Sequence, residues 1–198
     1  MPENISRARF SYPVFLDLDG VLVLVVGGGR IGARKAAGLI SAGARVRLVA
    51  TEVSAHVDRD RIVDLREHPF ESADLDEIRL VITATGDHDV DQAISAAARE
   101  RGIWTNAADQ PVDCEFILPA ITRVGRVTGA ISTDGASPAL AGYLRDRLAE
   151  ILDDRVAEVA DILASERRAV QEAGGSTEDI DWKPRLRELF DASESNPK

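Results

Sequence analysis

Residues 22–43 read LVLVVGGGRIGARKAAGLISAG and join an apolar run to a glycine-rich turn and then to an amphipathic segment. The run Leu22 to Val26 is apolar and rich in β-branched residues, which favours a strand covered on both faces in a parallel sheet. Residues Ile31 to Ile40 carry apolar side chains at helical spacing, and Gly43 stands where a C′ glycine ends a helix. The stretch therefore predicts a strand, a tight turn and a helix in succession.

Three glycines of the turn, Gly27, Gly29 and Gly32, have the G-x-G-x-x-G spacing. The first allows a sharp turn, the second lets the backbone approach a pyrophosphate, and the third allows close packing of helix on strand. The unpaired N–H groups at the start of the helix favour an anion there. A second predicted strand, Arg45 to Ala50, follows the helix, so we interpret the turn as a dinucleotide site rather than a plain glycine loop.

The end of this second strand bears on the choice of cofactor. In the usual dinucleotide fingerprint an acidic residue at this point binds the adenosine ribose. Here Ala50 and Thr51 occupy that place, and Glu52 is the nearest acid. The sequence therefore favours NAD over NADP.

Further strands and a helix extend the pattern over residues 1–112. The expected strands are Ile62–Leu65, Arg79–Ala84 and Ile103–Thr105, and the expected helix is Val90–Arg99. Parallel strands place their carboxyl ends at one edge of the sheet, where ligands bind. That edge would receive Thr85, Asn106 and Asp109. Five strands alternating with helices predict a Rossmann-like α/β domain that binds NAD.

The pattern changes after residue 112. Two β-prone runs, Phe116 to Ile121 and Val127 to Thr133, flank a Gly125-Arg126 turn without an intervening helix, which predicts an antiparallel pair. We expect residues 113–136 to form a small antiparallel β dimerisation segment and residues 137–198 a C-terminal helical domain that begins at an N-cap, Ser137. Apolar area exposed by these elements in a monomer favours a homodimer.

Composition excludes several classes of protein. The 24 Lys and Arg against 34 Asp and Glu give a net charge of −10, which argues against a nucleic acid partner held by charge. The single cysteine, Cys114, leaves no intramolecular disulfide and no cysteine cluster for a metal. His56, His68 and His88 lack metal-ligand spacing, so we expect surface residues and no metal site. Without an apolar run of membrane-span length or a signal-peptide core, we expect a cytoplasmic protein with no membrane contact.

Several motifs in order carry a resemblance to a known family. They are YPVFLDLDG (12–20), VVGGGRIGARKAAGLISAGARV (25–46), ITATGDHDVD (82–91), NAADQPVDCEFILPA (106–120) and AISTDGASPALAGYLRDRL (130–148). From Tyr12 to Glu150 the chain resembles the precorrin-2 dehydrogenase family, the dehydrogenase part of siroheme synthases. The resemblance implies an oxidoreductase of siroheme, and hence porphyrin-type tetrapyrrole, biosynthesis. It would be a homodimer that oxidises precorrin-2 to sirohydrochlorin with NAD. Some members also insert ferrous iron.

The resemblance also implies roles for particular positions. The pyrophosphate turn would comprise Gly27, Gly29, Arg30, Ile31 and Gly32, and Thr51 with Glu52 would form the ribose end. Asp109 matches the acidic residue that the family places at the active site, and Thr133 lies where relatives have Ser or Thr beside the substrate cavity. Thr85 completes the cofactor set. The remaining candidates for substrate binding are Asn106, Ser137, Arg123 and Arg126.

Three alternatives remain open on the sequence alone. Asp109 either acts as the base for the released proton or caps a turn ahead of Pro111. Arg123, Arg126, Arg145 and Arg147 either bind substrate carboxylates or are solvated charges paired with acids such as Asp146 and Glu150. The chain could also be a sirohydrochlorin ferrochelatase, alone or as a second activity, or a non-catalytic dinucleotide-sensing module. The NAADQP and ISTDGASP stretches favour the enzyme.

Overall fold

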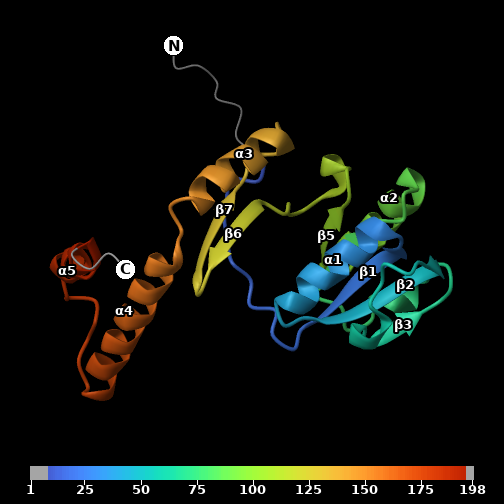
Figure 1. Ribbon diagram of the computed structural model, residues 1–198. Coiled ribbons are helices and arrows are strands. Elements are labelled where there is room, and N and C mark those ends of the chain that lie inside the picture. Colours follow the sequence, from blue (N-terminus) through green and yellow to red (C-terminus); the bar gives the residue numbers. More distant parts are fainter. Residues whose placement is uncertain (1–8, 195–198) are drawn as a thin grey trace, which may run out of the picture. The chain divides into compact units, whose positions relative to one another are not determined.

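The computed structural model describes residues 9–194. The chain divides into two compact units, residues 1–117 and 118–198. Figure 1 shows a helix-flanked sheet in the first unit, and a strand pair followed by helices in the second.

The first unit contains a five-stranded sheet in the order β3-β2-β1-β4-β5, and every neighbouring pair is parallel. This is the Rossmann-like arrangement that the sequence predicts. Between the central strands β1 and β4 the chain order reverses, and ligands of such sheets bind at the carboxyl ends of the strands there. The elements are β1 (Leu22–Gly28), α1 (Arg30–Ser41), β2 (Arg45–Val53), β3 (Asp64–Arg66), β4 (Leu80–Thr83), α2 (His88–Glu100) and β5 (Trp104–Ala107).

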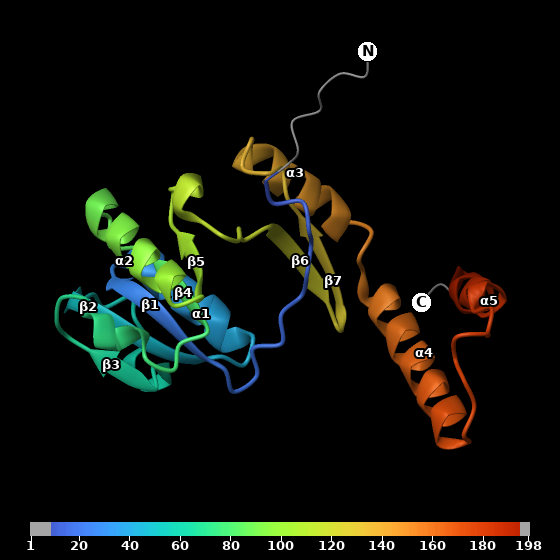
Figure 2. The same ribbon diagram turned by 180° about the vertical axis from the view of Figure 1, so that it is seen from behind.

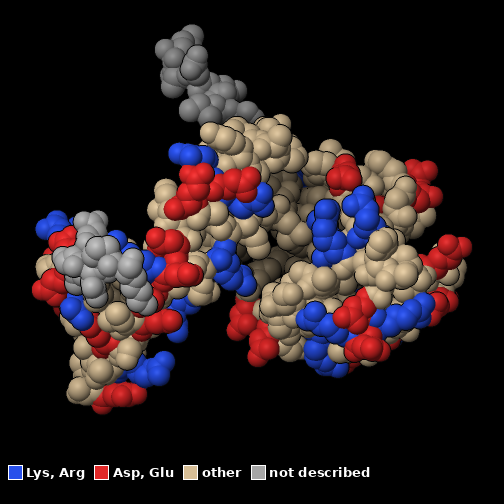
Figure 3. Space-filling model, in the orientation of Figure 1, with Lys and Arg blue, Asp and Glu red and all other residues tan. Residues whose placement is uncertain are grey.

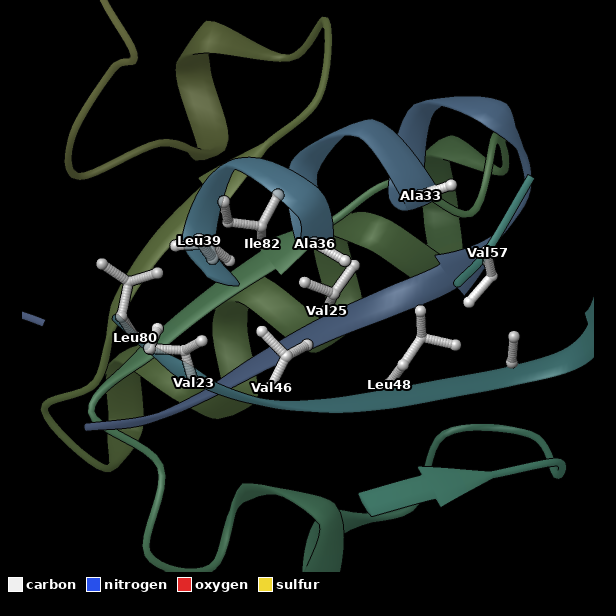
Figure 4. Packing of buried hydrophobic residues seen from close by; sticks show 12 residues of the cluster. Val23, Val25, Ala33, Ala36, Leu39, Val46, Leu48, Val57, Leu80 and Ile82 are labelled. Atoms are coloured by element: carbon white, nitrogen blue, oxygen red, sulfur yellow. The ribbon is translucent and has the colours of Figure 1, made fainter. Parts of the chain in front are cut away.

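Helices α1 and α2 cover opposite faces of this sheet, so β1 is buried on both sides (Figures 1 and 2). On one face Val23 and Val25 pack with Ala36 and Leu39 of α1, as Figure 4 shows. On the other face Leu24 and Val26 pack in the cluster that includes Ile94 of α2. The continuous apolar run of β1 follows from this double coverage.

Helix α1 ends as the sequence predicts. Gly43 has φ +86°, its N–H donates to the carbonyl of Ile40 (3.0 Å), and the N–H of Ala44 donates to that of Leu39 (3.1 Å). These two bonds form a Schellman motif, which needs a left-handed residue at the glycine position.

The predicted alternation of strands with helices is wrong between β2 and β4. The two connections contain only short 3₁₀ turns, η1 (Arg59–Arg61) and η2 (Ser72–Leu75). The segment before β3 includes the charged run Asp58-Arg-Asp-Arg61 and has no apolar stripe for a helix to bury. Polar contacts therefore anchor these connections instead of a packed helix.

Buried charges join β2, β3 and η2. Arg47 of β2 is buried; its Nε donates to Oδ2 of Asp64 (2.6 Å), and its Nη1 donates to the carbonyl of Asp74 (2.8 Å). Arg66 donates to Asp64 and to the buried carboxylate of Asp74. Burial raises the pKa of Asp64, but the bonds and charges of Arg66 and Arg47 outweigh it, so the pKa is lowered.

We expect Asp64→Asn to destabilise the protein by about 2 kcal/mol at pH 7, because Arg47 loses its ionised partner. A lowered folded-state pKa means that this contribution is complete above the unfolded pKa of about 3.9 and is lost as the pH falls through the lower folded value. Urea unfolding from pH 7 to pH 3 should therefore show the two proteins converging at acid pH. Asp60→Asn, at an exposed position of η1, is the control. A constant difference at every pH would contradict this role.

The second unit begins with an antiparallel pair, β6 (Ala120–Val124) and β7 (Val127–Ile131). Gly125 turns the chain between them with φ +51°, which confirms the predicted hairpin. Helix α3 (Pro138–Ala149) packs on this pair, and its N-cap is Ser137, whose Oγ accepts from the N–H of Leu140 (3.2 Å). Helices α4 (Asp154–Glu172) and α5 (Lys183–Glu194) complete the unit. Within residues 9–194 the helices are too short or too polar to cross a membrane.

Candidate functional site

A pocket of about 540 Å³ lies at the carboxyl edge of the sheet in the first unit. Three segments form it: the glycine turn after β1, the loop between β4 and α2 with the first turn of that helix, and the loop after β5. The lining residues are Gly29, Arg30, Ile31, Ala84, Thr85, Gly86, His88, Asp91, Ala108, Asp109 and Gln110. The pocket thus occupies the position where a doubly wound sheet binds its ligand.

The glycines of the turn are required by close backbone packing. Gly27 has φ +119°, and a Cβ there would overlap the carbonyl oxygen of Ala84. A Cβ on Gly32 would overlap the carbonyl oxygen of Gly27, and one on Gly28 would overlap that of Glu52. The turn is therefore held against both the β2 and β4 ends, and Gly28 is required although it lies outside the predicted spacing.

Gly29 differs from these three because a Cβ there would meet no atom within 4 Å. It is the N-cap of α1, and it lines the pocket with Arg30 and Ile31. No acidic residue occupies the first turn of α1. The bare backbone and the positive end of the helix leave room and charge for a pyrophosphate, so these residues fit a dinucleotide.

Thr51 and Glu52 lie near the end of β2, and both are exposed. Neither lines the pocket, but the carbonyl of Glu52 packs against Gly28 of the turn. Their place beside the glycine turn is the one at which the ribose end of a dinucleotide would lie.

Thr85 follows β4 and is bonded to α2. Its hydroxyl donates to Oδ1 of Asp91 (2.8 Å) and accepts from the N–H of Asp87 (3.1 Å). Asp87 caps α2, since its Oδ1 accepts from the N–H groups of Asp89 and Val90. The loop on the β4 side of the pocket is therefore well fixed.

Asp109 lines the pocket with an exposed carboxylate and has φ +60°, a left-handed conformation that few non-glycine residues adopt. Among residues 9–194 its carboxylate has no hydrogen bond or ion pair, and the 3₁₀ turn at Pro111 has no side-chain cap. The structure therefore gives no support to Asp109 as a cap. Its carboxylate is available to a ligand.

Lys35 interacts electrostatically with two neighbours, Cys114 and Asp109. Burial and, next, the Arg34 charge lower the pKa of Lys35, while Asp109 acts in the opposite direction. Burial raises the pKa of the Cys114 thiol, which donates toward the carbonyl of Ala107 (3.3 Å). Cys114 is therefore a buried core thiol and helps to close the loop that carries Asp109.

Asn106, predicted to bind substrate, is buried in β5 and is not part of the pocket lining. Its Nδ2 donates to the carbonyl of Phe116 (3.0 Å). This side chain links β5 to the segment after η3 (Pro111–Asp113) rather than facing the pocket.

The other predicted substrate residues lie in the second unit. Thr133 and Ser137 bond to each other: the N–H of Ser137 donates to Oγ1 of Thr133 (3.1 Å), which stabilises the start of α3. Arg123 donates to Thr128 within the hairpin, and Arg126 pairs with Asp161 (2.7 Å). All four side chains thus have partners inside their own unit.

The other two arginines are paired as the surface interpretation expects. Arg145 contacts Asp146 and Arg147 contacts Glu150, each at 2.6 Å. Figure 3 shows basic and acidic side chains interspersed on the visible face. Such exposed pairs contribute little to stability and can exchange partners.

The pocket also contains residues that the sequence did not assign to a binding site, among them Asp91, Gln110 and His88, which was expected only as a surface residue. His88 and Asp91 belong to the GDHDVD stretch that follows a predicted strand end, which is the signal that could have identified them. Gln110 directly follows Asp109. Of the three histidines, His56 is exposed and His68 lies 3.7 Å from Asp74.

Comparison with known proteins places these features in context. The chain is 40% identical over 165 residues to a siroheme synthase of Methylococcus capsulatus, covering 81% of this chain and 35% of that protein. It is 36% identical to a siroheme synthase of Mannheimia succiniciproducens, covering 81% and 34%. The chain therefore spans about a third of the length of the curated relatives it matches.

A solved structure titled "SirC, precorrin-2 dehydrogenase" superposes with a TM-score of 0.69 at 28% identity, covering 93% of this chain and 100% of that one. The family model described as putative NAD(P)-binding matches residues 14–120, which include the whole sheet and all three segments of the pocket. The sequence match over residues 14–120 shows that the chain belongs to the putative NAD(P)-binding family, and the open glycine turn of the fold agrees with this assignment.

Proposed function

We propose that this protein is a cytoplasmic NAD-dependent precorrin-2 dehydrogenase that forms sirohydrochlorin in siroheme biosynthesis. The observation that carries the proposal is the pocket itself, in which the unpaired carboxylate of Asp109 shares a cavity with the phosphate-binding turn of α1. The siroheme synthase relatives and the likeness to SirC support the choice of substrate.

Dehydrogenation removes a hydride and a proton from neighbouring atoms of the substrate. The bound nicotinamide would accept the hydride. Asp109 would accept the proton, because its carboxylate lines the pocket and makes no hydrogen bond to the described residues. Gly29, Arg30 and Ile31 would hold the pyrophosphate, and Thr85 would form the opposite wall. Thr51 and Glu52 would select NAD, because an acidic side chain at this point disfavours the 2′-phosphate of NADP.

The substrate contacts proposed from the sequence are Asn106, Thr133, Ser137, Arg123 and Arg126. Of these residues the arginines are the best candidates, because the ion pair of Arg126 with Asp161 is exposed and a tetrapyrrole carboxylate can take the place of Asp161. Asn106 supports it least, because its side chain is buried in β5.

An anaerobic assay with purified protein and precorrin-2, with NAD and NADP in parallel, tests the proposal. We expect formation of reduced nicotinamide and sirohydrochlorin, faster with NAD. If the protein binds NAD but oxidises precorrin-2 with neither NAD nor NADP, the dehydrogenase proposal is overturned and the dinucleotide-sensing module is favoured. Metal insertion into added sirohydrochlorin without dehydrogenation would favour the ferrochelatase.

We also propose a homodimer, on the basis of apolar side chains that α3 and β6 expose. Leu140 is 49% and Tyr143 62% exposed on one face of α3, and Ile121 of β6 is 51% exposed. The neighbouring exposed side chains Leu140 and Tyr143 mark an interaction surface on α3, and a second copy of the chain is the partner that symmetry favours.

Tyr143→Asp should weaken this dimer by a factor of about ten or more, because it places a charge in an apolar contact. Sedimentation velocity over a concentration series measures the effect. Ala149→Asp, an exposed position on another side of α3, introduces the same charge and should leave association unchanged. A wild-type chain that sediments as a monomer at all concentrations would refute the dimer.

A further inference from the structure

We propose that Asp91 and Gln110 are positioning residues that tie the loop carrying Asp109 to the loop carrying Thr85. The inference rests on the proposed function for its kinetic consequence, but the link itself is a feature of the first unit alone. The link connects the loop that would contact the cofactor, through Thr85, with the loop that carries the catalytic carboxylate of Asp109.

Asp91 is 1% exposed and lies in the first turn of α2. Its Oδ1 accepts from the hydroxyl (2.8 Å) and the N–H (3.2 Å) of Thr85, and its Oδ2 accepts from Nε2 of Gln110 (3.3 Å). A buried carboxylate needs such donors to offset its lost hydration. The two oxygens of Asp91 therefore serve the two loops separately, and only the Oδ2 contact reaches the loop of Asp109.

The orientation of the Gln110 amide follows from this contact. If the amide were rotated by 180°, its Oε1 would face Oδ2 of Asp91, and two acceptors would repel each other. In the observed orientation Oε1 is buried and accepts no hydrogen bond from the described residues. An unpaired buried acceptor costs free energy, so the bond to Asp91 is maintained against a local penalty.

The backbone around Gln110 explains why this bond matters for Asp109. The N–H of Gln110 donates to the carbonyl of Ala107 (3.3 Å), and its carbonyl accepts from the N–H of Asp113 (3.0 Å). Asp109 lies inside this turn with φ +60°. A left-handed non-glycine residue persists only where its surroundings fix it. The Cys114 thiol also contacts the carbonyl of Gln110 (3.4 Å), but the Asp91–Gln110 bond is made between two residues that line the pocket, so it fixes the turn from the pocket side.

Gln110→Ala removes this contact and leaves the bonds between Asp91 and Thr85 intact. We expect kcat with precorrin-2 to fall about tenfold, because the carboxylate is less well placed, while KM and Kd for NAD change less than twofold. Hydrogen exchange of the amides of residues 107–113 should become about tenfold faster, because the turn opens more often. Gln92→Ala, an exposed glutamine of α2, is the matched control and should match the wild type in every measurement.

Asp91→Asn provides a rescue test. Its Oδ1 can still accept from Thr85, and its Nδ2 can donate to Oε1 of a rotated Gln110 amide, so kcat should stay within threefold of wild type, unlike in Asp91→Ala. Unchanged exchange in Gln110→Ala, or a loss of NAD affinity that parallels the loss of kcat, would overturn the proposal. If the wild type does not oxidise precorrin-2, the proposed function fails, and the exchange rates and NAD affinities still decide the positioning role.

Discussion

Asp109→Asn is expected to lower kcat with precorrin-2 by about 100-fold or more while NAD binds normally, because a general base contributes roughly 10²–10⁴ in rate. Asparagine keeps the size of the side chain and tolerates the left-handed conformation at φ +60°. The substitution therefore removes the basic carboxylate with little change in the turn. Single-turnover kinetics and calorimetric titration with NAD provide the two measurements.

Asp109→Ala is the companion variant, since it removes the carboxylate but also pays for a left-handed alanine. Both variants should lose activity, and Asp109→Ala alone should lose about 1 kcal/mol of stability. Full activity in Asp109→Asn would show that another group accepts the proton. Lys35 would then be the first to test, because its charge interacts with Asp109 and its pKa is lowered by burial.

Substitutions at different glycines of the turn should affect protein stability and NAD binding separately. Gly32→Ala is expected to lower the free energy of unfolding by about 3 kcal/mol, because its Cβ would overlap the carbonyl of Gly27 and force α1 away from β1. Gly27→Ala should cost at least as much, since it adds a φ of +119° to an overlap with Ala84. Urea unfolding of each variant measures both losses.

Gly29→Ala should behave in the opposite way. The space around its Cβ is open and its φ of −78° suits alanine, so the free energy of unfolding should fall by only about 1 kcal/mol or less, because alanine is a poorer N-cap residue than glycine. Affinity for NAD should fall about tenfold or more, because the methyl group occupies the surface on which the pyrophosphate would lie. Gly38→Ala, in open space on the same helix, should bind NAD normally. Normal NAD binding by Gly29→Ala would exclude this turn as the phosphate site.

The central part of the fold could be predicted from the sequence because its signals are local. The apolar run of β1, the glycine spacing and the helical pattern of α1 each depend on neighbouring residues, and the structure confirms all three elements. The hairpin at Gly125 and the N-cap at Ser137 are confirmed for the same reason. Local chemistry determines where such elements begin and turn.

Other features depend on residues far apart in the chain. Asp91 reads in the sequence as an ordinary acid at the start of a helix, which the helix dipole favours, and only the fold brings Gln110 within reach of it. Gly28 is required because β2 ends against it. On α3 the leucines at helical spacing, Leu140 and Leu144, are 49% and 39% exposed, while Ala141 is buried. Periodicity does not identify the surface that covers a helix.

The order of strands in the sheet has a consequence for the growing chain on the ribosome. β1 pairs with β2 on one side and β4 on the other, so its second edge gains a partner only after Leu80–Thr83 has been synthesised. Until then one edge of an apolar strand lacks its partner, and parallel pairings between distant segments form slowly. A pause in translation before residue 83 would therefore prolong exposure of this unpaired apolar edge, whereas a pause after β5 has left the ribosome would give the sheet time to close.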